Sequence, residues 1–368
     1  MMWRHRRISY QTIGYSREAA VGQPALGLVA TAIVMAISLG FVSLFNFPTF
    51  VGWASFYNLC LIPFQIVAVV IWGGANPPFV SKLSQPVKGV VMLILTAVVA
   101  GIASRLALMA VGEGASPPGP IPSQFAVIVV PTTFYLAIIW GGWPFTNIFK
   151  NPVVAGIALL IASYLITYGI FSVFSDYSYL QGAPVYLQSS PKGMYNGEMV
   201  LVFYVTALAL MFLILCFDLW PLTTVPGIMK QPTLGTVFTL LILVGAAIAV
   251  QIGSAVTGSS WNRMVFFTRT TVPFIFGVIV VLNMLQNSLF AKMTQPLKGL
   301  MNAIAAAVIG SVLAQLYGAL EPTISGAMAP IPDAYEVWLA NALLSVTFPF
   351  LIFYAVYFNY WPLAKQSQ

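Results

Sequence analysis

Charged residues are scarce in this 368-residue chain, which holds 15 Lys and Arg and 8 Asp and Glu, together 6% of its residues. A soluble domain carries about 25% charged residues. Hydrophobic residues make up 60% of the chain, and its mean hydropathy is +0.92. Because so few charges cannot cover a surface that faces water, we expect one polytopic membrane domain with the lipid bilayer as its solvent. The basic residues are not clustered on one soluble face, so no nucleic-acid partner is expected.

Histidine and cysteine are nearly absent. His5 is the one histidine and lies in the N-terminal tail, whereas Cys60 and Cys216 lie inside apolar runs. A haem, copper or di-iron site in a membrane normally needs histidines, and two cysteines cannot build a zinc or iron–sulfur site. We therefore predict no metal and no cofactor, and we expect both thiols to be buried and inert.

Catalytic patterns are missing as well. The chain contains no GxxxxGK loop, no Ser/His/Asp set and no paired carboxylates. Membrane enzymes normally place His, Asp or Glu clusters near an interface, so the sequence predicts that the protein is not an enzyme. The basic start "MMWRHRR" leads into polar residues without a small-residue cleavage site, and we expect the first span to be retained.

Long apolar runs dominate what is present. A helix needs roughly 20 mainly apolar residues to cross a bilayer, and backbone groups in lipid must pair within the segment. Ten runs meet this requirement, at residues 26–45, 56–73, 90–111, 125–142, 157–174, 199–218, 236–255, 271–289, 300–320 and 338–358. The predicted fold class is therefore an all-α polytopic membrane protein with about ten transmembrane helices.

A Gln-Pro dipeptide, replaced once by Asn-Pro, returns five times at intervals of 62 to 80 residues. The five prolines of these turns are Pro24, Pro86, Pro152, Pro232 and Pro296. A small residue follows each proline three positions later, and an apolar run begins just beyond. A fixed period indicates a repeated structural unit, so we predict five tandem parallel helical hairpins over about 23–84, 85–150, 151–230, 231–294 and 295–368. Residues 1–22 would form a basic cytoplasmic tail before this single transmembrane domain.

Each predicted turn has a physical reason. Proline favours the first turn of a helix and excludes the preceding residue from the helix, and a glycine beyond it permits close helix packing. A lysine precedes the next turn, or the end of the chain, in every copy: Lys82, Lys150, Lys230, Lys292 and Lys365. These basic turns are expected to serve mainly as turns, with a soluble or membrane protein partner or anionic lipid as alternative ligands.

Charge is distributed unevenly between the two sides of this topology. With the N-terminus inside, eleven of the fifteen basic residues fall on the inner side, and most acidic residues fall outside. The positive-inside rule then places both termini in the cytoplasm, and we expect a multi-pass protein of a cell inner (plasma) membrane.

Polar residues near the outer ends of the first helix of each hairpin are candidates for a substrate path. Counted sixteen residues beyond the small residue of each turn, they are Ser43, Arg105, Gln251 and Gln315, with Phe171 in the third copy. They predict a polar ring at the mouth of a cavity, or simply helices that become polar at their ends. Arg263 and Arg269 would either draw anions to the outer mouth or contact lipid phosphate.

Two functions fit these features. The first is an inner-membrane permease or channel for a small neutral, aromatic or anionic solute, with a central path between the five hairpins. The alternative is a non-catalytic membrane scaffold or assembly subunit of a larger membrane complex. Bulky side chains in the middle of the helix ring would favour the scaffold, whereas a hydrated central cavity would favour transport.

Overall fold

The computed structural model describes residues 17–19, 22–73, 77–257, 265–326, 328 and 333–366. Helices make up 74% of the structure. Within the described residues, ten helices are long and apolar enough to span a membrane. This confirms the predicted all-helical class and the predicted number of spans, and it is compatible with a multi-pass membrane protein. His5 and Arg263 lie outside the described residues, as does nearly all of the predicted tail 1–22.

The ten spans alternate along the chain between two kinds. In the first kind, only 22% to 44% of the residues are buried, and these spans are called outer helices here. The outer helices are α1 (Ala25–Val42), α5 (Val87–Val111), α8 (Pro152–Phe174), α10 (Thr233–Thr257) and α13 (Leu297–Ile324). Their exposed sides carry Leu, Ile and Val, which is the surface expected of helices in contact with lipid.

The second kind, called inner helices 1 to 5, has 67% to 78% of its residues buried. They span Phe47–Ile71, Pro120–Ile139, Gly197–Cys216, Phe267–Met284 and Ala334–Tyr357. Inner helix 1 consists of α2 (Phe47–Thr49), η1 (Phe50–Ala54), α3 (Ser55–Ile66) and η2 (Val67–Ile71). Inner helix 2 consists of α6 (Pro120–Phe134) and η3 (Tyr135–Ile139), and inner helix 3 is α9 (Gly197–Cys216). Inner helix 4 consists of η6 (Phe267–Thr271), α12 (Val272–Ile279) and η7 (Val280–Met284). Inner helix 5 consists of α14 (Ala334–Ala340), η8 (Asn341–Thr347), α15 (Phe348–Ile352) and η9 (Phe353–Tyr357).

Prolines and wide π-helical turns interrupt four of the inner helices. Pro63, Pro131, Pro273 and Pro349 lie within these spans. Proline has no N–H to donate and crowds the carbonyl four residues earlier, so the helix must widen or bend nearby. The π-helical turns η2, η3 and η9 each begin four residues after such a proline. Turns of this kind often lie at functional sites.

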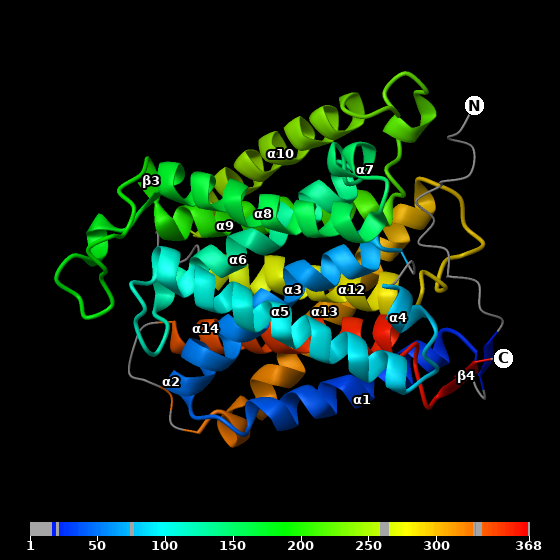
Figure 1. Cartoon of the computed structure of the whole chain (residues 1–368), viewed down its shortest axis with the longest axis horizontal. Coiled ribbons are helices and arrows are strands. Elements are labelled where there is room, and N and C mark those ends of the chain that lie inside the picture. The colour runs from blue at the N-terminus through cyan, green and yellow to red at the C-terminus, as the bar shows by residue number, and fades with distance from the viewer. Residues whose placement is uncertain are drawn as a thin grey trace.

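The five inner helices form a closed ring. Each contacts the next along the chain, and inner helix 5 contacts inner helix 1. Each outer helix packs mainly in the groove between the two inner helices that come before it in the circular order of the ring. Thus α5 contacts inner helices 5 and 1, α8 contacts 1 and 2, and α10 contacts 2 and 3. In the same way α13 contacts 3 and 4, and α1 contacts 4 and 5. In Figure 1, α10 and α1 lie at opposite edges of the bundle, and α3 and α12 lie in its middle.

The glutamine of each Gln-Pro turn connects an outer helix to an inner helix. In Gln23, Gln85, Gln231 and Gln295, the side-chain oxygen accepts a hydrogen bond from the N–H of the glycine four residues later. The side-chain nitrogen donates to a carbonyl at the end of an inner helix, namely Met284, Tyr357, Ile139 or Cys216. Asn151 instead caps its own helix by accepting from the N–H of Val153 at 2.9 Å. All five turn prolines lie at or just before the start of an outer helix.

The small residue beyond each proline permits this contact. A Cβ atom on Gly27 would overlap the Met284 carbonyl, and one on Gly89 would lie 2.6 Å from the Phe358 ring. Any larger side chain would therefore push the outer helix away from the inner helix to which its glutamine is bonded.

The two ends of the bundle differ. At one end, here called the lysine end, outer helices begin, inner helices finish, and Lys82, Lys88, Lys150, Lys230, Lys292 and Lys298 lie close by. The short helices α4 (Pro78–Ser81), α7 (Phe145–Ile148) and η5 (Leu222–Thr224) also lie there. Strands β1 (Arg17–Ala19) and β4 (Ala364–Gln366) pair antiparallel, so the two ends of the described chain meet at this end.

The opposite end, here called the loop end, carries the longest connection between described spans, residues 175–196. Residues 112–119 and 177–194 form two large loops, the second of which contains η4 (Ser178–Leu180). Strands β2 (Ser175–Asp176) and β3 (Tyr195–Asn196) pair in parallel at the base of the second loop. Figure 1 shows β3 and this loop at the far end of the molecule from β4.

Candidate functional site

A cavity of about 820 Å³, here called the chamber, lies inside the ring toward the loop end. All five inner helices contribute to its wall, as do the loop residues 115–119 together with Pro184, Val185 and Leu187. Representative wall residues from the five helices are Leu59, Val127, Leu208, Ile275 and Leu344. The closed ring of inner helices therefore encloses a central space of the size found in small-molecule sites.

The chamber wall is almost entirely apolar. Among the described residues that line it, none is charged. Its polar side chains are bonded to their neighbours: Gln124 accepts from the Tyr177 hydroxyl at 2.7 Å, and Asn341 donates to the Val337 carbonyl at 2.8 Å. Ser345 donates to the carbonyl of Asn341. The chamber thus offers apolar contact and few free hydrogen-bonding groups.

The two large loops cover the chamber and are connected over it. Pro117, Pro118, Pro184 and Val185 line the chamber from these loops. Glu113 in the first loop accepts a hydrogen bond from the backbone N–H of Ser189 in the second, at 2.6 Å. This bond holds the pKa of the Glu113 carboxyl below its usual range. The carboxylate form of Glu113 therefore connects the two loops.

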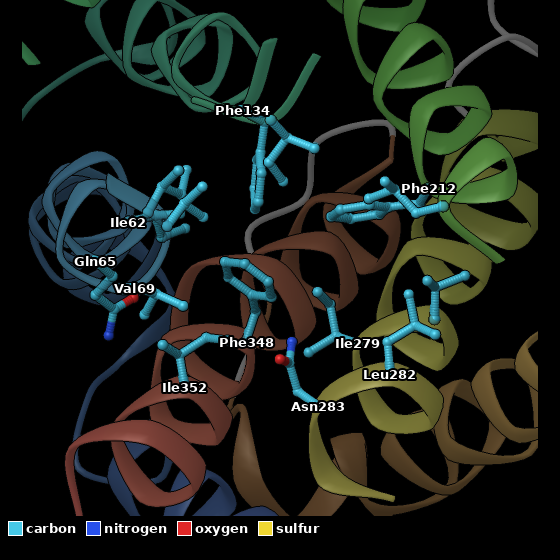
Figure 2. A pocket seen from close by; sticks show the side chains of 15 residues that line it. Ile62, Gln65, Val69, Phe134, Phe212, Ile279, Leu282, Asn283, Phe348 and Ile352 are labelled. Carbon is cyan, nitrogen blue, oxygen red and sulfur yellow. The ribbon is translucent and has the colours of Figure 1, made fainter. Parts of the chain in front are cut away.

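Three phenylalanines close the chamber toward the lysine end. Phe134, Phe212 and Phe348 come from inner helices 2, 3 and 5, and all are buried. The ring centroids of Phe134 and Phe212 lie 5.1 Å apart, and those of Phe134 and Phe348 lie 6.3 Å apart. Together with Ile62 they line both the chamber and a second cavity below it, and Figure 2 shows them converging on the centre of the ring. We call this cluster the constriction.

The second cavity, here called the lower cavity, has a volume of about 50 Å³. Its wall is apolar except for Gln65 of inner helix 1 and Asn283 of inner helix 4. The side-chain nitrogen of Gln65 donates to the Pro349 carbonyl at 3.0 Å. The two cavities and the constriction between them thus lie along the middle of one ring.

The polar residues predicted to form a ring at a cavity mouth are not brought together. Ser43, Arg105, Gln251 and Gln315 are exposed on the outer helices or at their ends, and none lines either cavity. Phe171, at the matching position of α8, is buried. Arg105, Gln251 and Gln315 are exposed positions within α5, α10 and α13, and Ser43 is exposed just beyond the end of α1.

Of the two arginines predicted at the outer mouth, the structure describes only Arg269. The side chain of Arg269 in η6 is 63% exposed and forms an ion pair at 3.3 Å with Glu336 of α14. It thereby connects inner helices 4 and 5 at the loop end. Arg263 lies outside the described residues. Arg269 does not line the chamber, so the pair contributes no charge to its wall.

Prolines in the middle of a span distinguish most of the helices that build the chamber from the outer helices in the sequence. The second apolar run of four of the pairs contains a proline near its middle, where a regular lipid-facing helix would have none: Pro63, Pro131, Pro273 and Pro349. Prolines in the middle of a span mark helices that are enclosed by other helices, because the neighbours satisfy the freed carbonyls. This signal would have identified four of the five inner helices, since α9 contains no proline.

The cysteines and the potential metal ligands do not indicate a further site among the described residues. Cys60 and Cys216 are buried free thiols. No group of three or more His, Cys, Asp or Glu side chains that could hold a metal ion occurs within the part of the chain that the structure describes. Comparison of the chain with protein-family models, with curated proteins and with solved structures gave no match.

Proposed function

We propose that the protein is a membrane permease for a small, neutral, apolar or aromatic solute, which moves along the axis of the inner ring. The observation that carries this proposal is the uncharged chamber enclosed by all five inner helices. In this route the solute enters from the loop end, rests in the chamber, passes the constriction and leaves at the lysine end.

The chamber wall determines the class of solute. A charged solute would lose its hydration on entering and would find no opposite charge there, which is strongly unfavourable. An aromatic solute that buries roughly 200 Å² of apolar surface would gain about 5 kcal/mol before the cost of association. The resulting weak binding suits a carrier that must also release its cargo. The proposal therefore keeps the neutral and aromatic solutes of the sequence-based hypothesis and leaves out the anionic ones.

The constriction is the proposed gate. Phe134 directly precedes the π-helical turn η3, and Phe348 directly follows η8. Widened turns leave helix carbonyls less tightly bonded, so small changes in the backbone there can move the adjoining side chain. The Glu113–Ser189 bond between the loops would be the corresponding closure at the loop end.

The arrangement of the pairs supports a repeat of five parallel hairpins. Each outer helix packs against the two inner helices that come before it in the circular order of the ring, and four of the five turns form the same two glutamine bonds. The lysine end would face the cytoplasm of a cell inner membrane under the positive-inside rule, which would put both termini there. Anionic lipid or a protein partner would meet the protein at this face.

Cysteine accessibility tests the path without knowledge of the solute. Single cysteines are placed at Leu208 in the chamber and Leu282 in the lower cavity, after Cys60 and Cys216 have been replaced by alanine. N-ethylmaleimide is small and neutral, so we expect both positions to react in proteoliposomes. A cysteine at Ala306 is the matched control, because this residue is fully buried between α12 and α13, away from both cavities.

The scaffold remains the second candidate because of one observation. The three phenylalanines fill the centre of the ring, as expected for a protein that only holds others in place. A scaffold has no need to open this cluster. If cysteines at Leu282 and Ala306 prove equally unreactive while the protein stays folded, the scaffold function is favoured and the path is not.

A further inference from the structure

We infer that Gln65 and Asn283 form a hydrogen-bonding station for the solute on the lysine side of the constriction. The solute class is then narrower than apolar and neutral: the molecule is mainly apolar but carries an N–H or O–H donor. This inference rests on the proposed permease function, since it describes the second binding position on the same path.

Gln65 presents a free acceptor at this position. The residue is only 1% exposed. Its side-chain nitrogen donates to the Pro349 carbonyl, and because a carbonyl oxygen can only accept, the nitrogen must face it. The amide oxygen is thereby fixed on the other side, where it has no hydrogen-bond partner among the described residues. Figure 2 shows this oxygen turned toward the side of the cavity and the nitrogen turned away.

A buried carbonyl oxygen without a partner is unfavourable and uncommon in folded proteins. Its cost is removed when a ligand or a water molecule donates to it. The lower cavity of about 50 Å³ has room for a few water molecules but not for an aromatic ring. A solute therefore reaches the Gln65 oxygen only when the constriction has opened and the chamber and lower cavity are joined.

Asn283 supplies the second amide of the same cavity. It lies on η7, and its half-buried carboxamide points into the space beside Phe348 and Ile279 in Figure 2. The Asn283 side chain has an oxygen that accepts and a nitrogen that donates. Its oxygen can therefore accept a hydrogen bond from the N–H or O–H of a solute. Every other described residue lining the lower cavity is apolar, and none is charged. The two amides are therefore the groups that distinguish a solute with a donor from one without.

The chamber and the lower cavity would therefore select the solute by two different properties, one after the other. The chamber accepts molecules by apolar surface and excludes charge. The lower cavity favours those that can donate a hydrogen bond to an amide oxygen that would otherwise stay unpaired. A site built around an unpaired buried polar group discriminates strongly against analogues that lack the matching group.

Indole and benzofuran are suitable probes because they have nearly the same shape and only indole has an N–H donor. Their binding is measured by equilibrium dialysis against protein in nanodiscs, with protein-free nanodiscs as the background. The protein is used as wild type and as Phe348→Ala, in which removal of one constriction ring joins the two cavities. We expect indole to bind more tightly than benzofuran by between about twofold and tenfold, with the larger ratio in Phe348→Ala.

Substitution of the amides should remove this preference. In the Phe348→Ala protein, Gln65→Met or Asn283→Leu should bring the indole-to-benzofuran ratio close to one and leave benzofuran affinity unchanged. Gln251→Met is the matched control, because it makes the same change at an exposed position on α10 and should keep the preference. Asn283→Leu also covers the case in which Gln65→Met fails to fold through loss of its bond to Pro349.

The binding results distinguish a failure of the amide station from a failure of the proposed permease function. If both probes bind but with equal affinity, or if the preference survives both amide substitutions, the amides hold water only and the inference is overturned. If neither probe binds above the protein-free background, the chamber is not a site for apolar solutes, and the proposed function fails together with the inference.

Discussion

Replacing Gly310 by alanine should separate α12 from α13 and lower the stability of the whole bundle. Gly310 and Gly277 face each other where these two helices pack closely. A Cβ atom on Gly310 would overlap the Pro273 carbonyl oxygen and lie 2.6 Å from its carbonyl carbon. Real Cβ atoms essentially never approach another heavy atom closer than 3.0 Å, so the backbones must move apart. No side-chain rotation relieves this contact, because the obstructing atoms belong to the backbone.

The size of the effect follows from two opposing terms. Overpacking of a close contact costs about 1–3 kcal/mol, and a backbone clash lies at the upper end of that range. Alanine in place of a helical glycine returns about 0.5–1 kcal/mol through its higher helix propensity. The net loss should therefore be about 2 kcal/mol. It would fall on α12, which belongs to the inner ring, so the effect should extend to the chamber.

Gly169→Ala provides the matched control. Gly169 lies in the outer helix α8, and an added Cβ there meets no atom within 4 Å. We expect this variant to be as stable as the wild type or slightly more stable. The assay heats each purified variant in the same detergent and measures the monodisperse fraction by size-exclusion chromatography. If Gly310→Ala and Gly169→Ala lose their monodisperse fractions at the same temperature, the close packing of α12 on α13 is refuted.

Three further outcomes are expected. Gln231→Ala removes the hydrogen bonds to the Ile139 carbonyl and the Gly235 N–H, and should lower the stability of the protein by about 1–2 kcal/mol in the same heating assay. A loss of stability no larger than that caused by Gln251→Ala would show that the turn bonds contribute little. Because its hydrogen bond to Ser189 lowers the pKa of Glu113, the bond between the loops is present above the usual carboxyl range and is lost as pH falls through the lowered pKa. Maleimide labelling of a cysteine at Leu201 in the chamber should therefore be slower than in a Glu113→Gln background at neutral pH, and the two rates should converge in acid. Equal rates at neutral pH would exclude the loop closure.

The sequence predicted the positions of the spans because length and apolarity are properties of each segment alone. Ten runs of the required length became ten helices, and the Gln-Pro turns marked where the outer helices begin, since proline is best tolerated at the start of a helix. These features depend on neighbours in the sequence and need no knowledge of the packing.

The directions of the side chains could not be predicted in the same way. In a helix surrounded by lipid, the lipid-facing and protein-facing sides are both apolar, so hydrophobic contrast gives no orientation. Arg105, Gln251 and Gln315 share a depth, but depth does not say whether a residue faces the ring or the lipid. The packing of each outer helix on inner helices of other pairs is a long-range feature, and it leaves no local pattern. The mid-span prolines carried the missing information about which helices are enclosed.

Binding of benzofuran to the protein in nanodiscs is the sharpest test of the apolar chamber, because the surface of this probe is almost entirely apolar and it has no hydrogen-bond donor. We expect saturable binding above protein-free nanodiscs. This binding should be lost when Val205→Trp and Leu344→Trp are combined to fill the chamber from inner helices 3 and 5. The same two changes at Leu240 and Val244, on the exposed side of α10, should leave binding intact. Binding no greater than in empty nanodiscs, or binding that survives in the chamber-filled protein, would contradict the account.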